Sequence, residues 1–282
     1  MRRDAHDSTL STFTASDGDN IALQEWPLHG VTPRGAVVVV HGLGEHAGRY
    51  DHVARRLNRW GFMVRGYDQY GHGESDGKRG ALPVSARLLD DLTDVIESTR
   101  ARTAPGLPLI VLGHSLGGLI AAWHVALGGV PIDGLVLSSP ALAIGLSAFQ
   151  QLLLATLPRF APNLTVGNGL DPDFLSHNPM VVARYRADPS VHDRISGRLA
   201  RFMADGGPQV IGRAAQWTVP TLLMYAGADH IIDPRGSRAF AAAAPAQVVT
   251  AHCFEGLFHE IFNELDSEPV FELLRQWLDT RF

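Results

Sequence analysis

The chain has 282 residues, of which 45% are hydrophobic, so it is long and apolar enough to bury a sizeable core. Its formal net charge is −5 with acidic and basic residues interspersed, which argues against a nucleic-acid-binding surface. The single cysteine, Cys253, excludes an internal disulfide and favours a reducing compartment.

Short apolar runs alternate with amphipathic segments along most of the chain. The runs that predict strands cover 21–26, 36–41, 62–68, 109–114, 134–139, 221–227 and 247–254. The segments between them that predict helices, apolar at about i, i+3 and i+4, cover 50–61, 85–100 and 116–129. Such alternation implies strand–helix–strand crossovers. We therefore expect an α/β fold, with a mostly parallel central sheet that helices cover on both faces.

The alternation stops between about residues 141 and 217. Several prolines interrupt helical and loop-like sequence there, and the strand pattern resumes at Val219. Because the sheet needs the later strands, an insertion explains this region better than a second independent domain. We expect a single α/β core of residues 1–140 and 218–282 with a helical cap inserted at 141–217.

The segment Gly113-His114-Ser115-Leu116-Gly117 fits the pattern G-x-S-x-G. It follows an expected buried strand and opens an expected helix, which is the context of a nucleophilic serine on a strained turn. Glycines beside the serine avoid collisions with the neighbouring strand and helix. The structural alternative is a serine that caps the helix, with glycines that only permit close packing.

A serine hydroxyl needs a base, and the base needs a group that orients it. Asp229 lies just past one expected strand and His259 lies in the loop after the next, so both come from the carboxyl ends of strands. Asp233 could replace the acid, and His230 or His252 could replace the base. We expect His252 to lie within a strand and to point into the sheet packing.

These residues predict acyl transfer. His259 would accept the proton of Ser115 as it attacks a carbonyl, and Asp229 would fix the tautomer of the ring. The oxyanion would need donors already in place, and the backbone N–H groups of Leu43 and Leu116 are the expected ones.

A glycine-rich segment after the second strand offers a different interpretation. Gly42-x-Gly44-x-x-Ala47, with Asp68 at the end of the next strand, satisfies a dinucleotide-binding pattern. That interpretation leaves Ser115 without a role. No phosphate-binding P-loop and no H-E-x-x-H metal motif is present, so we expect neither a cofactor nor a metal.

Five ordered motifs resemble the monoacylglycerol lipase and lysophospholipase group of α/β-hydrolases. They are HGLGEHAGRY, YDQYGHGESDG, GHSLGG, AGADHIID and GLFHEIFNE. The resemblance implies the same catalytic and oxyanion residues. It also implies that Glu45 and Arg49 arrange the polar end of the pocket, although an i, i+4 ion pair explains them equally well. Phe262 stands where the animal monoacylglycerol lipases have a second histidine, which implies a more apolar alcohol subsite.

The first part of the expected cap has an apolar face. It is formed by Phe149, Leu152, Leu153, Thr156 and Leu157. This face could line an acyl-chain channel, touch a lipid surface or simply bury against the core. The segment lacks a basic polar face, so we do not expect stable membrane anchoring. Its apolar face is compatible with transient contact with a lipid surface.

The sequence thus favours a serine hydrolase of carboxylic esters that acts on monoacylglycerols or similar fatty acyl esters. Phe149 and Leu153 would bind the acyl chain. The alternatives are a lysophospholipase, a broad-specificity carboxylesterase or thioesterase and, in another class, a non-catalytic binding protein with this fold. No apolar run reaches the length of a bilayer span and no signal peptide is evident, so we expect a soluble cytoplasmic protein. The expected partner is a small acyl ester or lipid, and the sequence leaves the oligomeric state open.

Overall fold

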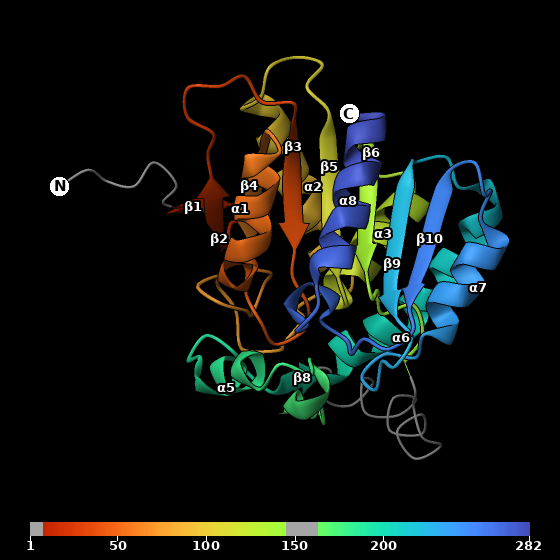
Figure 1. The fold of residues 1–282 in the computed structure, drawn as a ribbon. Coiled ribbons are helices and arrows are strands. Elements are labelled where there is room, and N and C mark those ends of the chain that lie inside the picture. Colours follow the sequence, from red (N-terminus) through yellow and green to blue (C-terminus); the bar gives the residue numbers. More distant parts are fainter. Residues whose placement is uncertain (1–7, 145–162) are drawn as a thin grey trace.

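A twisted eight-stranded sheet forms the centre of the computed structural model, which describes residues 8–144 and 163–282 (Figure 1). In spatial order the strands are β1 (Thr9–Thr14), β2 (Asn20–Trp26), β4 (Phe62–Tyr67), β3 (Gly35–Val40), β5 (Leu109–His114), β6 (Gly134–Ser138), β9 (Thr221–Ala226) and β10 (Val249–Phe254). The first two pairings are antiparallel and all the others are parallel. The expected mostly parallel sheet is therefore confirmed.

Helices cover both faces of the sheet. Helices α1 (Asp51–Arg59) and α8 (Glu268–Arg281) lie in front of it in Figure 1, whereas α2 (Arg87–Ala101), α3 (Leu116–Ala126) and α7 (Arg235–Ala243) lie behind. Strand β3 shows why two layers form. Its alternate residues Val37 and Val39 pack in the core with α1 and α8, and Val38 and Val40 pack with α2 and α3.

The two edges of the sheet differ from what the apolar runs predict. Strand β1 was not expected, because its residues alternate between exposed and half-buried positions. Strand β10 is the opposite edge and has one neighbouring strand, β9. His252 of β10 is exposed, so the expectation that it points into the sheet packing is wrong.

The chain between β6 and β9, here called the β6–β9 segment, is described from residue 163 onward. It contains β7 (Thr165–Gly167), α5 (Pro179–Ala187), β8 (Arg194–Ser196) and α6 (Gly197–Arg213). Strands β7 and β8 form a two-stranded antiparallel sheet where only helices and loops were expected. In Figure 1, α5 and β8 lie beyond the ends toward which the arrows of β3 and β9 point.

Hydrogen bonds join this segment to the loops at the carboxyl ends of the strands. The backbone N–H of His192 donates to the carbonyl of Gly44 at 2.8 Å, and that of Ser196 donates to Gly80 at 2.8 Å. The N–H of Glu260 donates to the carbonyl of Leu175 at 2.8 Å. The segment therefore lies directly on the loops that hold the predicted site residues. Among the described residues, no helix is both long and apolar enough to cross a bilayer.

Candidate functional site

Ser115 occupies a sharp turn between β5 and α3. Its φ of 53° and ψ of −118° are unusual for a residue with a side chain, and strain of this kind costs on the order of 1–3 kcal/mol. A Cβ atom on Gly117 would lie 2.1 Å from the carbonyl oxygen of Val40, and one on Gly113 would lie 2.5 Å from the Gly117 oxygen. The glycines are thus required by close backbone approach. The Ser115 side chain makes no capping hydrogen bond, which disfavours the interpretation as an ordinary helix cap.

The acid and the base expected from the sequence form a buried pair. The His259 Nδ1 lies 2.7 Å from the Asp229 Oδ2, and each side chain is only 3% exposed. The other carboxylate oxygen of Asp229 accepts the backbone N–H groups of Ile231 and Ile232 at 2.8 and 2.9 Å. These bonds fix the carboxylate behind the ring, so that the opposite ring nitrogen, Nε2, is left for chemistry.

The electrostatics of this pair favour an ionised acid and a basic imidazole. Burial opposes the charge of Asp229, but the His259 ring and the two backbone donors hold the pKa of the carboxyl below its usual value. Burial likewise opposes protonation of His259, but the Asp229 carboxylate and the charges of Glu260 and Glu45 raise the pKa of the ring above its usual value. A ring tuned in this way is suited to accept a proton.

The alternative acid and base lie elsewhere. The Asp233 carboxylate binds the side chain of exposed Arg235 at 2.7 Å. The His230 ring is exposed and packs on Phe174, with ring centroids 4.5 Å apart. Neither residue contacts the Asp229–His259 pair in the way a substitute partner would.

His259 and Ser115 come from neighbouring loops. The ring of His259 packs on that of His114, the residue before the serine, with centroids 4.7 Å apart. Burial and the His259 ring lower the pKa of His114 to about 4, so the His114 ring is uncharged at pH 7. Within the part of the chain that the structure describes, no hydrogen bond joins the Ser115 hydroxyl to the His259 ring.

Two backbone N–H groups are free to receive an oxyanion. Leu116 is the first residue of α3, so its N–H has no acceptor within the helix. Leu43 lies in the loop after β3, outside any helix or strand. Neither N–H donates a hydrogen bond to any residue in the described ranges. A helix N-terminus beside a second free donor is a favourable environment for a developing negative charge.

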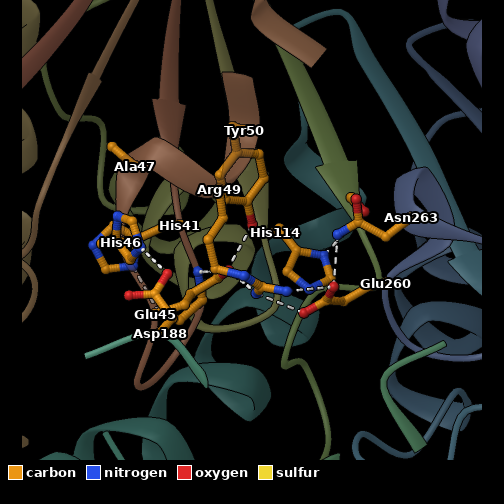
Figure 2. Close-up of polar contacts among 12 residues, drawn as sticks. His41, Glu45, His46, Ala47, Arg49, Tyr50, His114, Asp188, Glu260 and Asn263 are labelled. Atoms are coloured by element: carbon orange, nitrogen blue, oxygen red, sulfur yellow. Dashed lines mark hydrogen bonds and ion pairs between the residues drawn. The ribbon is translucent and has the colours of Figure 1, made fainter. Parts of the chain in front are cut away.

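A buried network, here called the Arg49 cluster, lies next to His114, whose ring centroid is 6.4 Å from that of Tyr50 (Figure 2). It consists of Glu45, Arg49, Tyr50, Glu260 and Asn263. The Arg49 guanidinium donates to both oxygens of Glu260, at 2.7 and 2.8 Å, and also to Glu45. Tyr50 donates to Glu45 at 2.7 Å, and the Asn263 amide donates to Glu260 at 2.6 Å. Glu45 and Glu260 are each 5% exposed at the side chain, and Arg49 is 11% exposed.

The Arg49 cluster joins the two loops that hold the site. Glu45 accepts the backbone N–H of Gly42 at 2.6 Å and so restrains the turn that presents Leu43. Glu260 directly follows His259. Burial opposes the charge of Glu45, but Arg49 and the other groups around the carboxyl, including the Tyr50 hydroxyl, together outweigh it and lower the pKa of that carboxyl to about 2. Glu45 is therefore ionised, and one arginine holds it together with Glu260.

Glu260 was not singled out from the sequence. The only local signal is a glutamate between the candidate histidine and the apolar pair Ile261 and Phe262, a setting in which a charge needs a buried partner. For Glu45 and Arg49 the structure shows the i, i+4 ion pair, and their expected role at the polar end of the pocket stays a prediction.

Of the other three residues expected at the substrate subsites, the structure describes only Phe262. Phe262 is 5% exposed and packs in the core under α8, with its ring centroid 5.1 Å from that of Phe271. It is thus a packing residue in this structure. Phe149 and Leu153 lie outside the described residues.

The dinucleotide interpretation finds no support in the geometry. Asp68 uses one carboxylate oxygen for the N–H of Ala47 at 2.8 Å and the other for the N–H of Glu74 at 2.9 Å. It joins two loops and is not poised for a ribose. Among the described residues, no group of three or more His, Cys, Asp or Glu side chains is arranged to hold a metal ion.

Comparisons with known proteins agree with this geometry. The family model described as "Serine aminopeptidase, S33" matches residues 31–266. The chain is similar to a monoacylglycerol lipase of Mycolicibacterium smegmatis, with 36% identity over 270 residues and 95% of each chain covered. It is also similar to phospholipase YtpA of Bacillus subtilis, with 31% identity, 90% of this chain and 98% of that one. The crystal structure of Paleococcus ferrophilus monoacylglycerol lipase superposes with a TM-score of 0.81 at 35% identity, covering 98% of this chain and 100% of that one.

Proposed function

Because the chain belongs to the serine aminopeptidase S33 family of α/β-hydrolases and is a serine hydrolase, we propose that it hydrolyses monoacylglycerols through an acyl-enzyme on Ser115. The observation that carries this proposal is the buried Asp229–His259 pair at 2.7 Å, next to a serine with a φ of 53°. Relatives named as monoacylglycerol lipases, similar over nearly the whole chain, support the choice of substrate.

In the proposed acylation step, His259 removes the hydroxyl proton as the Ser115 Oγ attacks the ester carbonyl. Asp229 keeps the ring in the tautomer with its lone pair on Nε2 and stabilises the imidazolium that forms. The tetrahedral oxyanion accepts the N–H groups of Leu43 and Leu116. Loss of one such donor typically costs roughly 3 kcal/mol of barrier.

The tetrahedral intermediate then collapses. The C–O bond to the alcohol breaks, and the His259 imidazolium returns its proton to the departing glycerol. In deacylation a water molecule replaces the alcohol, His259 takes the proton of the water, and the fatty acid leaves while Ser115 regains its hydrogen. The restraints that Arg49 places on both loops would keep the oxyanion donors and the base in register through these steps.

Two features favour an ester over a peptide with a free amino terminus. An aminopeptidase needs an unpaired carboxylate to hold the substrate ammonium. In the described residues around the pair, Glu45 and Glu260 are both bound to Arg49 and are not free for that task. The named relatives cited above are lipases or a phospholipase, which also supports an ester.

The proposal also covers the acyl-chain contacts, a second candidate substrate and the cellular compartment. The β6–β9 segment, residues 141–217, would act as a cap, and Phe149 and Leu153 would contact the acyl chain. The Bacillus relative named as a phospholipase supports lysophospholipids as the second candidate substrate. The single cysteine supports action in the reducing cytoplasm.

The direct test compares the chain with its Ser115→Ala variant on a panel of monoacylglycerols, lysophospholipids, p-nitrophenyl esters and an aminoacyl anilide. We expect monoacylglycerols to be hydrolysed with the highest kcat/KM. The variant should lose roughly 10⁴-fold or more of kcat and all labelling by a fluorophosphonate probe. Full labelling of the variant would refute Ser115 as the nucleophile. Faster cleavage of the anilide than of every ester would refute the proposed reaction.

A further inference from the structure

A cavity of about 750 Å³ lies between the loop after β4 and the β6–β9 segment. None of Ser115, Asp229 and His259 lines it, so it is separate from the proposed ester site. The residues that matter for its chemistry are Lys78, Arg79, Asn168, Tyr185, Arg186 and Arg194.

The cavity is positively charged although the whole chain is acidic, with a net charge of −5. Its four cations, Lys78, Arg79, Arg186 and Arg194, face two carboxylates. Those carboxylates are engaged. Asp188 binds the His46 ring at 2.9 Å and the N–H of Ser190 at 2.9 Å, and Asp193 binds Arg194 at 3.2 Å. Arg186 pairs with Asp173 at 3.1 Å.

Two cations are left without a counter-charge. The side chains of Lys78 and Arg79 have no ion pair or hydrogen bond within residues 8–144 and 163–282. Lys78 is exposed, but Arg79 is half-buried, where an unpaired charge is more costly. A half-buried arginine with free donors is a natural receptor for a planar or tetrahedral oxyanion, because its fork of N–H groups matches two oxygens at once.

Among the described residues of the cavity, the His192 ring lies near Arg79 and supplies no negative charge. Burial and the Arg79 charge lower the pKa of His192 to about 4, so the ring is neutral at neutral pH. Its two nitrogens are already used, one toward the carbonyl of Gly71 at 3.1 Å and the other by the N–H of Arg194 at 3.1 Å. The unused charged donors of the cavity are therefore those of Lys78 and Arg79, and Asn168 is a further lining residue whose buried amide nitrogen lacks an acceptor in the described structure.

We infer that this cavity is an anion site that binds a phosphate group, with Arg79 and Lys78 as the charged donors. The phosphate could belong to the headgroup of an anionic lipid or to a small soluble molecule, and the recognising groups are the same. The site does not depend on the proposed ester hydrolysis. It adjoins the ester site through Tyr185, whose ring forms part of the cavity wall and lies 4.8 Å from the Arg49 guanidinium.

The first experiment titrates the full chain with inorganic phosphate by calorimetry at low ionic strength, with chloride at matched ionic strength as the reference salt. We expect saturable binding of phosphate that Arg79→Gln weakens at least tenfold. Arg184→Gln is the control, because Arg184 lies on α5 two residues from the cavity residue Arg186 but does not itself line the cavity. It should change the affinity less than twofold. Equal affinity of the native chain and Arg79→Gln, or equal binding of chloride, would overturn the site.

A second experiment separates the two sources of phosphate and measures sedimentation with vesicles of phosphatidylcholine, with and without phosphatidylglycerol. The ligand is a lipid headgroup if the native chain sediments with the anionic vesicles, if Arg79→Gln does not, and if inorganic phosphate releases the native chain. Phosphate binding without vesicle retention would identify a soluble phosphate compound. Either result supports the cavity as the site. Because Arg79 has no ion pair or hydrogen bond to lose among the residues that the structure describes, its glutamine variant should melt within roughly 2 °C of the native chain, so a folding defect will not mask the answer.

Discussion

Two buried arginines, Arg49 and Arg87, have nearly the same local surroundings. Each pairs with a carboxylate four residues away in the chain, Glu45 for the first and Asp91 for the second. Each guanidinium also lies over a tyrosine ring, at 4.8 Å in the first case and 4.5 Å in the second. A residue-by-residue description of charge and burial would not separate them.

The two clusters differ in the segments that they connect. Arg49 reaches Glu260, beside the proposed base, and so joins two loops of the site. Arg87 reaches Asp17 and Asp19 in the turn between β1 and β2, and so ties the edge of the sheet to α2. A buried ion cluster thus acquires a functional or a structural role from the elements that it holds together. Three substitutions test this distinction.

Removal of Arg49 should have the largest effect, because it affects both stability and catalysis. Arg49→Gln leaves Glu45 and Glu260 buried without a cation, and breaking a buried pair typically costs about 3–5 kcal/mol of unfolding free energy. We also expect kcat/KM to fall roughly a hundredfold, since both loops lose their restraint. Urea denaturation and steady-state kinetics on a monoacylglycerol would measure the two losses.

Arg55→Gln is the control for that variant, because Arg55 lies on α1, which begins two residues after Arg49, and its ion pair with Asp51 is exposed to solvent. It should change both quantities little. A kcat/KM for Arg49→Gln within threefold of the native value would show that the Arg49 cluster is not needed for catalysis.

Removal of Arg87 should affect stability alone. Arg87→Gln strips the buried carboxyl of Asp91 of its cation, and we expect about 3 kcal/mol of lost unfolding free energy. Burial already raises the pKa of Asp91 to about 7, so the carboxyl can take up a proton and limit the loss. Below the melting transition, kcat/KM should stay within twofold of the native value. A tenfold loss of kcat/KM in the folded variant would remove the contrast between the clusters.

Replacement of Glu260 should have the smallest effect and the most specific one. Glu260→Gln keeps the size of the side chain and loses one charge-assisted pair, so we expect about a tenfold lower kcat. The charges that face His259 belong to Asp229, Glu45 and Glu260, with neutral His114 packed on the ring. The carboxylates raise the pKa of His259, so loss of one of them lowers that pKa.

The direction of the pH effect follows from the role of the base. His259 acts in its neutral form, and activity is lost as the pH falls through its pKa. A lower pKa in Glu260→Gln therefore moves the acidic limb of the kcat/KM profile to lower pH. A merely structural role of Glu260 would lower the whole profile and leave the limb in place, and that outcome would contradict the proposed coupling.

Much of the sheet could be predicted because its signals are local. The buried strands are runs of Val, Ile and Leu, and the turn at Ser115 is marked by glycines that close packing requires. Strand β1 was missed because an edge strand with exposed residues has no apolar run, and β7 and β8 because three residues are too few to show a period.

The remaining errors concern contacts between distant segments. Arg49 and Glu260 are 211 residues apart, so nothing in either segment indicates that they pair. Phe262 was expected at a subsite by analogy, and that role stays a prediction, but its packing on Phe271 of α8 could not be seen from the sequence. His252 was assigned to the interior from its strand, but β10 lies at the edge of the sheet, where one face stays open to water.

The backbone at Ser115 also limits how this enzyme can be made more heat-resistant. Glycine would adopt a φ of 53° without a steric penalty. The serine therefore lowers the free energy of unfolding by roughly 1 kcal/mol, and in return the turn presents a hydroxyl. A library selected only for survival at high temperature would favour glycine at this position and fill with inert variants. Directed evolution of this fold therefore has to select for turnover in the same round as for heat resistance.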